Sequence, residues 1–99
     1  MAGKVSITFA ASAIGDLEEL QAYYAGEGAP DVGVRLTDEI ISLIEHLSAH
    51  PRSGRVVPEF QVEHLREVIF PPFRIVYRFE KNKVRIVRVW RGERLLKMP

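Results

Sequence analysis

The C-terminal third of the sequence constrains the fold most, because it contains two consecutive stretches in which apolar and polar residues alternate. The first covers Phe73–Glu80 and the second Lys83–Trp90, and only Lys81-Asn82 separates them. Alternation with a period of two is typical of β-strands with one buried face, and a two-residue polar connection is typical of a hairpin. The sequence therefore predicts a β-hairpin around which the rest of the chain is arranged.

The residues before this hairpin predict two more strands and two helices. Alternating β-branched and aromatic residues indicate strands over Lys4–Phe9 and about Val62–Phe70. Apolar residues spaced three and four apart indicate amphipathic helices over about Ala13–Gly26 and Pro30–Ala49. The expected fold is α+β, in the order β-α-α-β-β-β, with a helical hairpin packed on one face of a mainly antiparallel four-stranded sheet.

Local signals set the expected boundaries and faces of these elements. Ser12 is the expected N-cap of the first helix, and residues 51–58 read as a loop. In the strand Phe73–Glu80 the aromatic and aliphatic residues at every second position are expected to face the core: Phe73, Ile75, Tyr77 and Phe79. Arg74, Val76 and Arg78 are then expected on the other face.

Length and composition exclude several classes of protein. The chain has 99 residues, which predicts one domain over residues 1–99. It has no cysteine, no apolar run long enough to span a bilayer and no secretion signal, so the expected location is the cytoplasm, without membrane association. His46, His50 and His64 are too scattered for a local metal site, and no phosphate or dinucleotide motif is present. No metal or cofactor is expected.

Charge is distributed unevenly along the chain. Residues 1–50 carry a net charge of −6 and residues 51–99 a net charge of +7, with histidine counted as neutral. This asymmetry predicts an anionic partner for the C-terminal half. The expected contact residues are the arginines of the hairpin and the tryptophan beside them: Arg74, Arg78, Arg85, Trp90, Arg91 and Arg94.

Period-two alternation allows Arg74, Arg78, Arg85 and Arg91 to share one face of the sheet. Guanidinium groups suit bidentate contacts with carboxylate or phosphate. Two alternatives stand beside this interpretation: the arginines lie on a solvated face, and Trp90 is a core residue that caps the helical hairpin.

Several short motifs, in order along nearly the whole chain, carry a family resemblance. They are Leu17–Tyr24, Ile44–Gly54, Leu65-Arg66-Glu67, Phe73–Tyr77 and Val87–Arg94. Together they resemble the ParE/RelE superfamily of toxins from type II toxin–antitoxin systems. The resemblance implies the fold expected above. It also implies a hetero-oligomer with a cognate antitoxin, whose C-terminal segment wraps the toxin. The toxin is then expected to reach operator DNA only through the antitoxin.

The superfamily divides by mechanism. RelE-like members resemble ribosome-dependent mRNA endoribonucleases. The resemblance implies a nuclease set of three residues: a basic residue shortly before the Phe73-Arg74 motif, a second basic residue just after the last strand, and a C-terminal tyrosine. These positions fall here at Ile69, at about Gly92 and in a C-terminal tail without tyrosine. If the chain were such a nuclease, its catalytic groups would be Arg66, Arg74, Arg91 and Arg94. The ParE-like branch resembles inhibitors of DNA gyrase that act by binding and need no catalytic residue. We therefore expect a ParE-like gyrase inhibitor, with the endoribonuclease and a member that only binds its antitoxin as alternatives.

Overall fold

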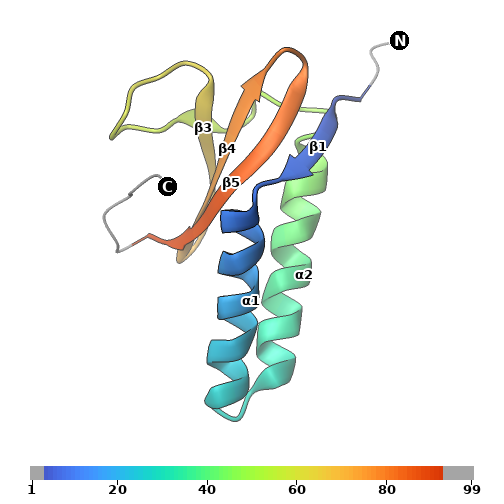
Figure 1. Cartoon of the computed structure of the whole chain (residues 1–99), viewed down its shortest axis with the longest axis vertical. Coiled ribbons are helices and arrows are strands. Elements are labelled where there is room, and N and C mark those ends of the chain that lie inside the picture. Colours follow the sequence, from blue (N-terminus) through green and yellow to red (C-terminus); the bar gives the residue numbers. More distant parts are fainter. Residues whose placement is uncertain (1–3, 93–99) are drawn as a thin grey trace.

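The computed structural model describes residues 4–92, which form two helices and a five-stranded sheet (Figure 1). The elements follow the order β1 (Ser6–Phe9), α1 (Ala11–Gly26), α2 (Pro30–His46), β2 (Arg55–Val56), β3 (Leu65–Phe70), β4 (Phe73–Glu80) and β5 (Lys83–Arg91). The sheet order is β1-β5-β4-β3-β2, with β1 parallel to β5 and all other pairs antiparallel. The expected α+β fold is confirmed, with one strand more than expected.

The predicted hairpin is formed by β4 and β5, which lie inside the sheet. Lys81 and Asn82 both have positive φ, of 53° and 59°, as the favoured two-residue hairpin turn requires. Ile75, Tyr77, Val84 and Ile86 of this hairpin are 0% exposed. They face the helices and form the main core with Ala13, Leu20, Ile40, Ile44 and Leu47.

The two helices form an antiparallel hairpin that covers one face of the sheet and extends beyond its edge (Figure 1). α1 begins at Ala11, so the prediction of Ser12 as N-cap is wrong. The Ser12 hydroxyl instead donates a 2.7 Å hydrogen bond to the Val87 carbonyl, which ties the start of α1 to β5. No helix among residues 4–92 is both long and apolar enough to cross a membrane.

The extra strand, β2, lies within the stretch that was expected to be a loop. It has only two residues, Arg55 and Val56, which pair with Glu67 and Arg66 of β3. The chain beyond it, residues 57–63, folds over the outer face of the sheet, which is the face turned away from the helices. There Val57 packs with Leu65, Val76 and the partly buried Trp90 in a second apolar cluster. Trp90 therefore packs into an apolar cluster, as the alternative of a core residue expected, but on the face of the sheet turned away from the helical hairpin.

Candidate functional site

A groove runs between α1 and the ends of β4 and β5, on the helix side of the sheet. Its volume is about 560 Å³. The lining combines aromatic rings, carboxylates and one guanidinium: Asp16, Glu19, Leu20, Tyr23, Tyr24, Phe73, Val89, Trp90 and Arg91. Tyr23 is 59% exposed and meets Tyr24 edge to face, with ring centroids 5.1 Å apart. Exposed aromatic groups beside a few charged groups are typical of a surface that binds a protein segment.

Asp16 fixes the wall of this groove by joining α1 to β5. Its carboxylate accepts two hydrogen bonds of 2.8 Å from the Arg88 guanidinium and a third of 2.8 Å from the Val89 backbone N–H. Arg88 in turn lies over the Trp90 ring, with Cζ 4.1 Å from the ring centroid. β1 ends at Phe9, opposite Ile86, so the later residues of β5 have no strand beside them on that edge. There Ser12 binds the Val87 carbonyl and Asp16 binds the Val89 N–H.

Arg91 does not share a face with Arg74, and that prediction is wrong. Arg91 is paired with Phe73 in the sheet register, and its Cζ lies 5.7 Å from the Phe73 ring centroid, on the groove side. The cause is a β-bulge: Val76 pairs with Arg88 whereas Tyr77 pairs with Ile86, so Val87 is an extra residue. One extra residue moves every later side chain of β5 to the opposite face.

Arg74 lies on the outer face in a buried ion-pair network. Its Nε donates to Glu67 at 2.7 Å, and its two terminal nitrogens donate to Glu59 at 2.6 and 2.8 Å. Arg55 binds the other oxygen of Glu67 at 2.7 Å, and the Glu67 side chain is 0% exposed. The two carboxylates, Glu59 first, raise the pKa of Arg74, so its charge is permanent. Three of the five N–H donors of the Arg74 guanidinium, one on each nitrogen, are thus bound to carboxylates within the chain.

The same contact lowers the pKa of Glu59 to about 2, mainly through its hydrogen bonds to Arg74. Because the folded value lies below the ordinary value of 4.5, this carboxylate stabilises the fold above that pH. The contribution is then lost as pH falls from there toward 2. The Glu59 side chain is 35% exposed, so solvent screening reduces the effect to about 1 kcal/mol.

We therefore expect Glu59→Gln to be less stable than the wild type at pH 6, by about 1 kcal/mol. The two proteins should converge by about pH 2, where the carboxylate of the wild type is protonated. Urea denaturation at both pH values measures the difference. A difference that stays constant with pH would show that Glu59 acts through packing and not through its charge.

The other predicted residues are dispersed. Arg78 and Arg85 face each other across β4 and β5 on the outer face. Arg66 donates to the Gly54 carbonyl at 3.0 Å and pairs with Glu63. Arg94 lies outside the described residues. His46 and His50 stack with ring centroids 4.5 Å apart, and among residues 4–92 no group of three or more His, Asp or Glu is arranged to hold a metal ion.

Sequence reasoning missed the groove residues Asp16 and Tyr23 and the buried carboxylate Glu67. The role of Asp16 appears only in the structure, where its carboxylate binds Arg88 and the Val89 N–H of β5. With its neighbours Glu18 and Glu19 it was explained by the helix dipole, which favours anions early in a helix. Tyr23 and Tyr24 are adjacent aromatic residues at the end of a helix, a pattern that a core also produces.

Solved structures of toxin–antitoxin systems share this fold. A chain of the chromosomal ParDE system from P. aeruginosa superposes with a TM-score of 0.78 at 21% identity, covering 93% of this chain and all of that one. A chain of the toxin–antitoxin complex RelBE2 from Mycobacterium tuberculosis gives a TM-score of 0.66 at 21% identity, covering 89% of this chain and 98% of the other. A comparison with curated protein sequences gave no significant match. The fold class is that of the ParE and RelE toxins.

The family follows from the sequence match. The family described as "ParE toxin of type II toxin-antitoxin system, parDE" matches residues 7–96, which is most of the chain. The chain belongs to this ParE toxin family.

Proposed function

We propose that this ParE-type toxin inhibits DNA gyrase by binding it, without chemistry of its own, and that it does so in the cytoplasm. A cognate antitoxin neutralises it by occupying the groove between α1 and the β4–β5 hairpin. In this proposal the two proteins form a hetero-oligomer, and the antitoxin provides recognition of operator DNA.

The observation that carries the proposal is the commitment of Arg74 to Glu67 and Glu59. A nuclease needs a cationic group free to stabilise charge on the scissile phosphate, and both carboxylates already occupy this guanidinium. Ile69, at the first position of the nuclease set, is an apolar residue on β3 that is 45% exposed. Arg66, another candidate catalytic group, already binds a backbone carbonyl and a carboxylate.

The groove supports a role in binding. Tyr23 offers exposed aromatic surface, while Glu19 on one side and Arg91 on the other place both signs of charge at the rim of the groove. Extended or helical peptides bind such surfaces through a few aromatic anchors, and the charged rim sets their orientation. An antitoxin segment or a gyrase segment of matching charge fits this description.

The experiment that tests the proposal pairs two assays of the purified protein. One measures supercoiling of relaxed plasmid by gyrase, and the other measures mRNA cleavage on translating ribosomes. We expect inhibition of supercoiling and intact mRNA. Ribosome-dependent cleavage with unaffected gyrase would contradict the proposal and establish the endoribonuclease instead.

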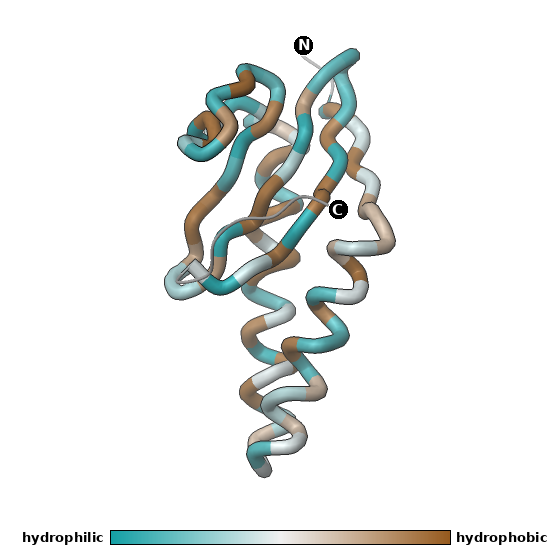
Figure 2. Tube along the Cα trace, turned by 60° about the vertical axis from the view of Figure 1, so that its left-hand side comes forward, coloured by the Kyte–Doolittle hydropathy of each residue, from teal (hydrophilic) through white to brown (hydrophobic). Residues whose placement is uncertain are grey.

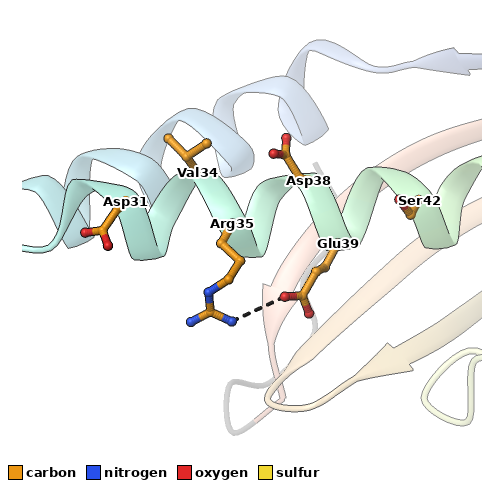
Figure 3. Close-up of a pocket in the computed structure, with 6 residues that line it drawn as sticks. All are labelled: Asp31, Val34, Arg35, Asp38, Glu39 and Ser42. Atoms are coloured by element: carbon orange, nitrogen blue, oxygen red, sulfur yellow. Dashed lines mark hydrogen bonds and ion pairs between the residues drawn. The ribbon is translucent and has the colours of Figure 1, made fainter.

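Two charge-introducing variants locate the binding surface. Tyr23→Glu places a carboxylate in the groove, and Val34→Glu places one on α2, where Val34 is 49% exposed and points away from the Arg35–Glu39 pair (Figure 3). We expect Tyr23→Glu to weaken inhibition at least tenfold, since aromatic anchors contribute ~2 kcal/mol or more to binding. Val34→Glu should inhibit like the wild type. Equal inhibition by both variants would place the binding surface elsewhere.

A further inference from the structure

We infer that the outer face of the β4–β5 hairpin, near its turn, is a contact site for the phosphate backbone of duplex nucleic acid. The site consists of Arg78 on β4, Lys81 in the turn, and Lys83 and Arg85 on β5. It lies on the face of the sheet opposite the groove. Its ligand is the sequence-independent phosphodiester backbone, which differs from the recognition of an operator that the proposed function assigns to the antitoxin.

The sheet register brings these cations together. Arg78 is directly opposite Arg85, and Lys83 is opposite Glu80. Parallel pairing with β1 places Ser6 beside Lys83 and Thr8 beside Arg85, and the Arg85 guanidinium donates to the Thr8 hydroxyl at 3.2 Å. The end of the hairpin is accordingly hydrophilic, as the teal turn at the top of Figure 2 shows.

The charge of this patch is not balanced within the chain. Glu80 is the one carboxylate in the sequence from Phe73 to Arg91, and it lies 3.9 Å from Arg78, the longest ion-pair distance described. Lys81, Lys83 and Arg85 are exposed. Like charges directly opposite each other on neighbouring strands destabilise a sheet. The Arg78–Arg85 pair therefore favours an external anion that bridges the two side chains.

The absence of apolar anchors favours phosphate over an acidic protein. Among the described residues, the large exposed apolar side chains are Ile14, Tyr23, Val34, Phe60, Val62 and Ile69. None of them lies on β1, β4 or β5, the strands that carry the patch. Protein interfaces have an apolar core depleted of charge, whereas nucleic-acid interfaces are more polar and much more positive. The patch matches the second kind.

The four cations lie at the turn end of the hairpin, where β1 flanks β5 as far as Lys83. With four cations available for phosphates, a plot of log Kd against the logarithm of the salt concentration has an expected slope of about 3.6. Affinity should then fall about 100-fold between 50 and 200 mM salt.

The test measures fluorescence anisotropy of a labelled mixed-sequence 20-base-pair duplex, titrated with the full-length protein at both salt concentrations. The variant Lys83→Gln/Arg85→Gln should lower the salt slope by about 1.8, which leaves a loss of only ~10-fold over the same salt range. Arg35→Glu on α2 is the matched control, because it changes the net charge by the same amount on another surface. It should retain the slope of the wild type.

A polyglutamate peptide titrated in the same way represents an acidic protein partner. Tighter binding to polyglutamate than to the duplex would overturn the inference. So would the same salt slope in the double variant and the wild type, or no duplex binding at 50 mM salt. This test is independent of the proposed target. A protein that inhibits gyrase but binds no duplex refutes only this site, and a protein that binds duplex but leaves gyrase active refutes only the gyrase proposal.

Discussion

Arg74→Ala is expected to lower the free energy of unfolding by about 3–5 kcal/mol. The substitution removes one of the two guanidinium partners of Glu67, whose side chain is 0% exposed, and removes both hydrogen bonds to Glu59. Glu67 then keeps only Arg55, and a buried carboxylate whose charge is less fully compensated is costly because it remains away from water. Urea denaturation measures the loss, which corresponds to a fall in Tm of more than ~10 °C for a chain of this size.

Arg78→Ala is the matched control on the same strand and the same face. The Arg78 side chain is 40% exposed and its ion pair is long, so the expected change is at most about 1 kcal/mol. A second test adds Glu67→Gln to Arg74→Ala. It removes the buried carboxylate, which keeps only Arg55 as a partner, and should recover part of the lost stability. Equal losses for Arg74→Ala and Arg78→Ala would show that the network does not stabilise the fold.

Gly54→Ala is expected to destabilise the protein by about 3 kcal/mol or more, the sum of overpacking and a lost buried hydrogen bond. A Cβ at Gly54 would lie 2.6 Å from both the Glu67 carbonyl oxygen and the Tyr77 hydroxyl. That hydroxyl accepts a hydrogen bond from the Gly54 N–H at 3.0 Å and donates one to the Pro51 carbonyl at 2.7 Å. Because one of the two close atoms is the backbone oxygen of Glu67 on β3, β2 and β3 must separate to make room for the methyl group.

Gly15→Ala controls for the general effect of replacing glycine. Nothing lies within 4 Å of a Cβ at Gly15, inside α1, so alanine there should stabilise the helix by about 0.5–1 kcal/mol. Thermal denaturation of both variants should therefore show shifts of opposite sign. A Gly54→Ala protein as stable as the wild type would mean that β2 is not held against Tyr77.

The sequence predicted the β4–β5 hairpin well because its alternation is long and its turn is short. β2 was missed because two residues carry no periodicity, and its pairing depends on Glu67, which is distant in sequence. The face of Arg91 was wrong for a single reason. Counting by twos from Arg85 ignores the bulge at Val87, which no residue type marks and which only the pairing partner reveals.

The role of Arg74 was equally hidden from the sequence. Its motif indicated a cation on an accessible sheet face, and a strand glutamate such as Glu67 reads as solvated. Only the chain that crosses the outer face, bringing Glu59 and Val57 over β3 and β4, makes that surface an interior. The binding roles predicted for Arg78, Arg85, Trp90 and Arg91 stay predictions, now divided between two faces of the sheet.

The central claim is that this toxin acts on gyrase by binding alone. Titrating a fixed amount of gyrase with the purified protein, while following plasmid supercoiling, tests it most directly. Inhibition should rise with the ratio of toxin to gyrase and should not deepen with incubation time at a fixed ratio. With Tyr23→Glu in place of the wild type, the same inhibition should need at least ten times more protein. Full supercoiling activity at a large excess of folded wild-type toxin would contradict the account.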